Sequence, residues 1–259
     1  MATLLDSLES HDFFKVEFKI GDEEKSKKLL KKIDTTLRNQ TQVDLVHDYY
    51  RLHAVKAEEY PFPFLLWTKT VSKKIGYTEG LLESLKQYGW NTAYVDWEAS
   101  LNAYEEALEI YEKLGDKEGI AHVKSRIGLW HFGQTQYVTA LQFLFESLDI
   151  YRATGNKTKM VSSYHNIADT YRHIKDTLNT IKYLKRSADL EKEYQDAGIR
   201  AMNNNFLGEI YLEQGKFEAA KKHLNISNAV IQKSGEQHYL IVYILMHLGT
   251  LVEKMGHVQ

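Results

Sequence analysis

Histidine is the residue type in this sequence with the widest chemistry, because its eleven copies could bind a metal or exchange protons near neutral pH. His165 and His173 share one expected helix but lie two turns apart, whereas the histidines of a helical zinc site lie one turn apart. No His-Glu-x-x-His string occurs, and no cysteine is present to complete a site. We therefore expect ordinary surface or groove histidines, with no metal and no cofactor.

Other catalytic signatures are also missing from the sequence. It has neither a Gly-x-Ser-x-Gly nucleophile turn nor a phosphate-binding Gly-x-x-x-x-Gly-Lys loop. No catalytic residue is predicted, and we expect a protein that is not an enzyme.

Charge and composition narrow the kinds of partner and the compartment. Lys plus Arg number 33 and Asp plus Glu 35, so a formal net charge of -2 provides no strong field for nucleic acid or an anionic membrane. The absence of cysteine fits a reducing compartment. The first residues lack a basic segment followed by an apolar one, and no apolar run approaches the roughly 18 residues that span a bilayer. The sequence predicts a soluble, cytoplasmic protein.

Glycines mark an internal repeat, and such a period decides the architecture. Turn-like strings place glycines at 76, 115, 155 and 235, and Gln195 occupies the position where an evenly spaced glycine is missing. A second small residue follows each turn at a constant interval, at Gly89, Gly128, Ala168 and Gly208, and one position later than expected at Gly249. Packed helices lie about 8–10 Å apart, so a bulky side chain at these positions would separate them.

Apolar residues between these landmarks recur at helical spacing, so each repeat is predicted to form two amphipathic helices. The expected helices span residues 3–18, 23–38, 42–59, 63–75, 78–93, 97–113, 118–134, 137–153, 158–174, 177–193, 198–214, 217–233 and 237–255, with boundaries good to about three residues.

The least regular junction of the chain contains both prolines, Pro61 and Pro63, each where a helix is expected to begin. We expect a helical N-terminal cap of degenerate repeats over residues 1–62 and a regular repeat array over residues 63–259. Residues 253–258 match the inter-helix turn at 213–217, which favours an array that continues beyond residue 259 over a final helix that serves as a cap.

The last regular copy carries a known signature. The pattern resembles the Leu-Gly-x-x-Tyr signature of the tetratricopeptide repeat (TPR), and it consists of Leu207-Gly208 and Tyr211 followed by Ala220 and Leu224. Residues 127, 128, 140 and 144 repeat it. The resemblance covers about residues 64–255. Two departures are a longer period, about 40 residues where the standard repeat has about 34, and the missing proline that often closes such a repeat. It implies an all-α, right-handed superhelical solenoid of antiparallel helix pairs, as in sensory proteins of bacterial signalling.

In a solenoid of this kind the first helix of each pair lines the concave surface, and its non-core positions meet the ligand. Related domains often use an Asn two residues before the small landmark to bind a ligand's backbone, which is the place of Asn166. The predicted groove residues are Arg126, His165, Asn166, Asp169, Arg172, Asn205 and Glu209. They indicate a module that binds a protein or peptide, as the sensory or scaffolding part of a bacterial signalling protein, with a response regulator or a fused signalling domain as a further partner.

A weaker resemblance leads to an alternative function. A helical N-terminus followed by such repeats is similar to the Rap-type peptide-sensing regulators of Gram-positive bacteria, which include response-regulator aspartate phosphatases. In those proteins a Gln of the N-terminal bundle assists hydrolysis of a phospho-aspartate, and Gln42 is the nearest candidate here, although its spacing to Tyr49 and Tyr50 does not match well.

Overall fold

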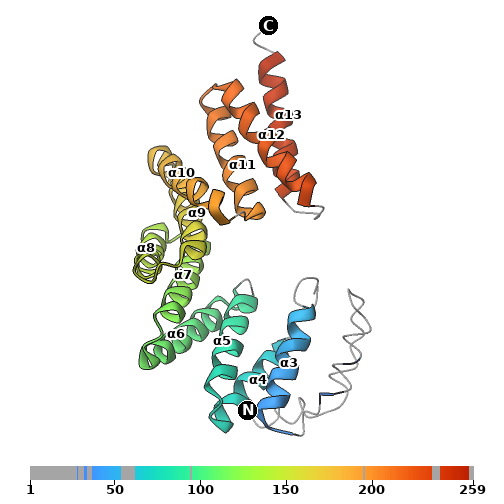
Figure 1. Ribbon diagram of the computed structural model, residues 1–259, viewed down its shortest axis with the longest axis vertical. Coiled ribbons are helices and arrows are strands. Elements are labelled where there is room, and N and C mark those ends of the chain that lie inside the picture. The colour runs from blue at the N-terminus through green and yellow to red at the C-terminus, as the bar shows by residue number, and fades with distance from the viewer. Residues whose placement is uncertain are drawn as a thin grey trace. The chain divides into compact units, whose positions relative to one another are not determined.

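The computed structural model describes residues 28, 32, 33, 37–53, 62–93, 95–194, 196–234 and 240–256. All regular elements in these ranges are α-helices, labelled α3 to α13 in Figure 1. The predicted all-α class is thereby confirmed. The chain divides into two compact units, Met1–Asp116 and Lys117–Gln259, which are described separately. The expected helix 3–18 and most of 23–38 lie outside the described residues.

The helices of the first unit are α3 (Gln40–His53), α4 (Phe62–Ile75), α5 (Thr78–Thr92) and α6 (Trp97–Leu114). Helix α3 packs on α4 and α5. Val43, Val46, Trp67 and Val71 form the buried core between α3 and α4. The four predicted helices of this region are therefore present, and the last residues of the expected helix 42–59, residues 54–59, lie outside the described residues.

The second unit consists of α7 (Lys117–Gly133), α8 (Tyr137–Thr154), α9 (Lys157–His173), α10 (Thr177–Tyr194), α11 (Ala197–Glu213), α12 (Phe217–Ser234) and α13 (Leu240–Gly256). These bounds agree closely with the predicted helices. Successive helices pack as the pairs α7 with α8, α9 with α10, and α11 with α12, and α13 packs on both α11 and α12. Figure 1 shows the last three helices side by side.

The turns between pairs explain the repeated Gly-Asp and Gly-Asn strings. Gly115 and Gly155 end α6 and α8 in the left-handed conformation, with φ of 69° and 71°, which glycine adopts without a Cβ penalty. The next residue in the second turn, Asn156, accepts a hydrogen bond from the backbone N–H of Lys159 and so caps α9. One dipeptide thus ends one helix and begins another. Gln195 and Gly235 lie outside the described residues.

The second landmark is a point of close contact within three helix pairs. A Cβ added at Gly208 would lie 2.6 Å from Leu224 Cγ, and one added at Gly128 would lie 3.0 Å from Leu144 Cγ. In the first unit, Gly89 similarly faces the ring of Tyr104. Ala168 occupies the matching position on α9 and is fully buried. Gly249 differs, because a Cβ there would meet no neighbouring atom of the described chain within 4 Å.

A third periodic feature, absent from the sequence prediction, fixes each second helix to its partner. Ser147, Ser187 and Ser227 recur once per repeat and are almost fully buried. Each hydroxyl donates a hydrogen bond to a backbone carbonyl of the preceding first helix, at donor–acceptor distances of 2.6, 3.0 and 2.7 Å. Fully buried leucines, Leu144, Leu184 and Leu224, lie three residues before these serines, so leucine and serine recur together on the inward face of α8, α10 and α12.

Within the described residues, no helix is both long and apolar enough to cross a membrane.

Candidate functional site

The predicted groove residues all lie on the first helices of the second unit. Helix α9 contacts both α7 and α11, so the three helices bring these side chains onto neighbouring surfaces. Five of them are half-buried, and we refer to these as the first-helix face: Arg126, Asn166, Asp169, Arg172 and Glu209. His165 and Asn205 are instead buried, at 7% and 2% exposure, and lie beneath that face.

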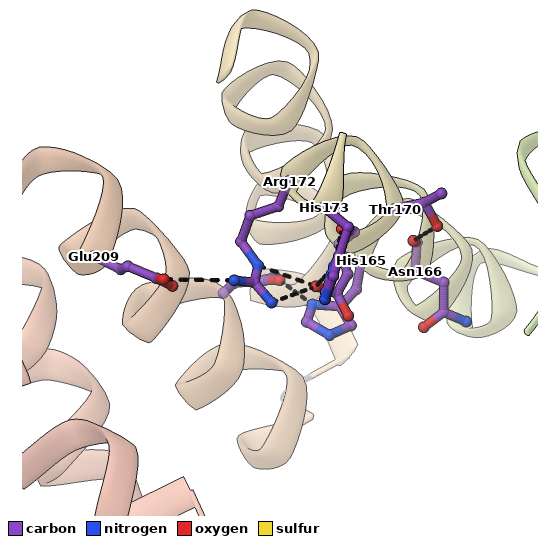
Figure 2. Close-up of polar contacts among 8 residues, drawn as sticks. His165, Asn166, Thr170, Arg172, His173 and Glu209 are labelled. Atoms are coloured by element: carbon purple, nitrogen blue, oxygen red, sulfur yellow. Dashed lines mark hydrogen bonds and ion pairs between the residues drawn. The ribbon is translucent and has the colours of Figure 1, made fainter. Parts of the chain in front are cut away.

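Arg172 is the centre of an ion-pair cluster on this face, shown in Figure 2. Its guanidinium donates to Asp169 Oδ1 over 2.9 Å on its own helix and to Glu209 Oε1 over 3.5 Å on α11. The same guanidinium lies 4.4 Å from the centre of the Phe206 ring, a cation–π contact. Each charged side chain is about a quarter exposed, so these pairs are worth modest stability, and Arg172 mainly fixes how α9 and α11 align.

Below this cluster, a buried chain of hydrogen bonds joins three helices. The Asn203 amide nitrogen donates to Ser187 Oγ over 2.8 Å, which leaves Asn203 Oδ1 as the acceptor facing His165 Nδ1 at 2.7 Å. His165 must therefore carry its proton on Nδ1. Ser187 in turn donates to the carbonyl of Val161. The chain runs from α9 through α11 and α10 and back to α9, and it gives each of these polar groups a partner.

Burial lowers the pKa of His165 below its ordinary value of about 6.5, because an imidazolium loses its hydration there. Asn203, Asp169 and Asp196 act in the opposite direction, and Arg172 adds to the lowering. Burial also lowers the pKa values of His223 and His247.

These lowered pKa values predict that the free energy of unfolding decreases in acid. The folded state binds fewer protons than the unfolded state, so stability present above about pH 6.5 is lost as pH falls toward the folded pKa. Urea midpoints measured from slightly alkaline to mildly acidic pH are expected to fall, and His165→Gln is expected to make the decline shallower. An unchanged decline in that variant would contradict a buried neutral His165.

Asn166 is the predicted groove residue best placed to bind a ligand. Its side-chain amide has no hydrogen-bond partner among the described residues, and the side-chain contact to this residue is the Thr170 hydroxyl, which donates to its backbone carbonyl over 2.8 Å. Figure 2 shows the amide to one side of the Arg172 cluster. A half-buried amide that can both donate and accept is suited to the backbone of an extended peptide.

Asn205 and Arg126 are less available than Asn166. Asn205 Oδ1 lies 3.1 Å from His247 Nδ1 on α13, and this contact together with burial gives Asn205 a structural partner. Arg126 already interacts with other residues of the chain.

Sequence reasoning missed Asn203, Phe206 and His247, which hold the site together. A usable signal was the recurrence of serine at 147, 187 and 227, because a buried serine beside an adjacent first helix offers a partner for an asparagine such as Asn203. Phe206 contacts both Arg172 and His165, and the His165 ring stacks on it with ring centres 5.3 Å apart. These contacts arise from packing between helices, so no local sequence pattern indicates them.

Stacked helix pairs that repeat at a constant interval, with a small residue facing the next helix in each pair, define a TPR-like helical repeat protein. Solved structures of similar fold include BtubC (BKLC) from P. vanneervenii, with a TM-score of 0.63 and 14% identity over 92% of this chain and 91% of that one. The apo form of RapI has a TM-score of 0.61 and 14% identity over 91% of this chain and 72% of that one. Aspartyl phosphate phosphatase F from Bacillus subtilis has a TM-score of 0.60 and 14% identity over 88% of this chain and 69% of that one.

At such identities the likeness concerns the fold alone. The sequence matches no protein-family model and no curated protein.

Proposed function

We propose that this protein binds an extended peptide, or an extended segment of another protein, across the first-helix face of its second unit. The observation that carries the proposal is the half-buried Asn166 amide, which has no partner among the described residues and lies beside a fixed ion-pair cluster. Because this amide is accessible and makes no hydrogen bond to another described side chain, a ligand's backbone can bind it without first breaking a contact within the chain.

The charges of the face support a ligand recognised through its backbone. Arg126 and Arg172 are balanced by Asp169 and Glu209, so the face has no excess of either sign. Arg172 already binds both carboxylates and is held over Phe206. A strongly acidic or basic partner would gain little here, whereas amide hydrogen bonds from Asn166 are independent of ligand sequence. We place this binding in the sensory or scaffolding part of a cytoplasmic bacterial signalling protein.

Selection from a displayed library of random peptides tests the proposal. We expect peptides to be enriched on the wild-type protein, and Asn166→Ala to weaken their binding about tenfold, because one or two amide hydrogen bonds are lost. Asn225→Ala is the matched control, since Asn225 is exposed on the second helix α12. Failure to enrich any peptide, or equal weakening by both variants, would contradict binding at Asn166.

The alternative is a Rap-like aspartate phosphatase or a peptide-regulated quorum-sensing regulator. It is supported by the fold similarity to RapI and to aspartyl phosphate phosphatase F. Gln42, the candidate catalytic amide, is only 7% exposed, and its backbone N–H donates to Asn39 Oδ1 near the start of α3. A buried amide cannot meet a partner's acyl phosphate without rearrangement of α3, so this residue favours the binding function. Hydrolysis of a phosphorylated response regulator by the purified chain would support the alternative instead.

A further inference from the structure

The turns within the α7–α8 and α9–α10 pairs carry exposed apolar side chains. Val138, the second residue of α8, is 82% exposed, and Leu178, the second residue of α10, is 85% exposed. Ile174, directly after α9, is 42% exposed. The second residue of α12 is Glu218, which is exposed and charged. The first two turns therefore keep an apolar surface where the third has an ordinary solvated one.

The same two turns keep a side chain at a position where the backbone favours glycine. Thr135 and Lys175 have φ of 58° and 60°, and Gly215 occupies this position of the α11–α12 turn with φ of 70°. In each turn the backbone N–H of this residue donates to the carbonyl three residues earlier, so the three turns have the same geometry. A Cβ at such φ values costs free energy that glycine avoids, above all in a β-branched residue such as threonine.

No contact within the described residues explains why these two side chains are kept. Thr135 and Lys175 are exposed, and neither side chain makes a hydrogen bond or ion pair with another described residue. Backbone strain that the fold does not need is typically kept for function. The strained residues and the exposed apolar residues occur in the same two turns, and both are missing from the third.

Aromatic rings join the two turns to each other and to the first-helix face. Phe132 and Tyr137 of the α7–α8 turn contact the ring of His173 at the end of α9, with ring centres 4.7 and 5.8 Å apart. His173 Nδ1 lies 3.0 Å from the backbone carbonyl of Asp169 and 3.3 Å from its Oδ1. Figure 2 shows His173 beside Arg172. Because Asp169 belongs to the first-helix face, the two turns are continuous with that face.

The charge on this surface comes from Lys175. Its ammonium group has no carboxylate partner among the described residues, and the adjacent Asp176 instead accepts two hydrogen bonds from Asn179 at the start of α10. A ligand carboxylate is complementary to this cation, and aliphatic ligand side chains are complementary to the apolar residues around it. We refer to the five exposed residues of the two turns as the turn edge: Thr135, Val138, Ile174, Lys175 and Leu178.

We propose that the peptide bound at Asn166 continues past the end of α9 onto the turn edge, which recognises large aliphatic side chains and one carboxylate of that peptide. The inference rests on the proposed peptide-binding function and adds the side-chain chemistry of the ligand. Ile174 follows Asn166 by eight residues, or about 12 Å of helix, a length that about four residues of an extended peptide span. The ligand therefore carries its aliphatic residues about four positions from the residue whose backbone Asn166 binds.

The test gives the α9–α10 turn the residues of the α11–α12 turn, with Lys175→Gly and Leu178→Glu in one chain. Gly215 and Glu218 occupy a turn with the same backbone hydrogen bonds, so the double variant is expected to fold with a Tm equal to or above that of the wild type. Val242→Glu is the matched control, because it replaces another apolar side chain, 65% exposed, in the first turn of a helix.

Peptides selected from a displayed random library on the wild-type chain are the probes, and fluorescence titration measures their binding to each variant. We expect the selected peptides to share aliphatic residues and an Asp or Glu. The double variant is expected to weaken their binding at least tenfold, because both the apolar contact and the charge pair are lost. Asn166→Ala is expected to weaken the same peptides about tenfold, and Val242→Glu less than twofold.

The outcomes separate this inference from the proposed function. Weakening by Asn166→Ala without weakening by the double variant would overturn the turn edge and leave the peptide site at Asn166 in place. The reverse pattern would retain the turn edge as the ligand site and overturn the function proposed for Asn166. Failure to enrich any peptide would overturn both.

Two further measurements on the double variant also decide the matter. A Tm below that of the wild type would show that the two side chains stabilise the turn itself, which would overturn the proposal. Light scattering that shows a wild-type dimer, converted to monomer by the double variant, would assign the turn edge to a second copy of this chain and would also overturn it.

Discussion

Gly208→Val is expected to lower the free energy of unfolding by about 3 kcal/mol, which corresponds to a fall of roughly 6–12 °C in Tm. A Cβ at this position would lie 2.6 Å from both Leu224 Cγ and Cδ2, and Leu224 is fully buried, so it has no free space into which to move. The valine methyls would add further overlap. Separation of α11 from α12 would also weaken the Ser227 hydrogen bond to the carbonyl of Ala201. Urea denaturation followed by circular dichroism measures the effect.

Gly249→Val is the matched control for this prediction. It makes the same change at the same position of the repeat, but on a helix whose outer side is open. Valine and glycine differ little in helix propensity at an exposed site, so we expect a change within about 0.5 kcal/mol. Equal destabilisation by the two variants would show that the loss comes from the helix itself and not from contact between helices.

Asn203→Ala is expected to be similarly damaging, by about 3 kcal/mol, because removing this polar side chain leaves a buried partner unpaired and reduces packing. Asn203 is fully buried and is the acceptor for His165 Nδ1 and the donor to Ser187 Oγ. The unpaired His165 N–H alone costs about 1–3 kcal/mol, and the lost packing adds to that. Thermal and urea unfolding of the full chain measure the change.

Asn225→Ala provides the comparison, because Asn225 is exposed on α12 and its replacement is expected to change stability by less than about 0.5 kcal/mol. A similarly small effect of Asn203→Ala would mean that the buried chain of hydrogen bonds does not hold α9, α10 and α11 together. In that case the pH dependence assigned to His165 would also lose its structural basis.

The contrast among neighbouring asparagines bears on how the site works. Asn203 and Asn205 are buried and engaged with His165 and His247, whereas Asn166 is half-buried with a side-chain amide that has no partner in the described part of the chain. The same residue type therefore stabilises the stacked helices at two positions and is available to a ligand at a third. Substitutions at the first two are expected to alter stability, and those at Asn166 to alter binding.

The sequence by itself determined the helices, their pairing and the points of closest contact. Helical periodicity of apolar residues is a local property, and Gly115 and Gly155 mark turns because a left-handed residue is needed there whatever surrounds it. The small residues Gly128 and Gly208 were likewise interpretable, because close approach of two helices excludes a larger side chain at the contact.

Only the tertiary structure decided which polar residues of the first helices face outward. His165, Asn166 and Asn205 have equivalent claims in a linear pattern, yet His165 and Asn205 are covered by contacts with adjacent helices, and Asn166 is not. The open side of α13 was equally hidden, since Gly249 looks like the other landmarks in the sequence and differs in that no atom of the described residues lies within 4 Å of its Cβ position. Whether a given helical position is buried depends on the helix that packs beside it. Which helix that is, and at what angle it packs, are set by contacts between residues one repeat apart in the sequence.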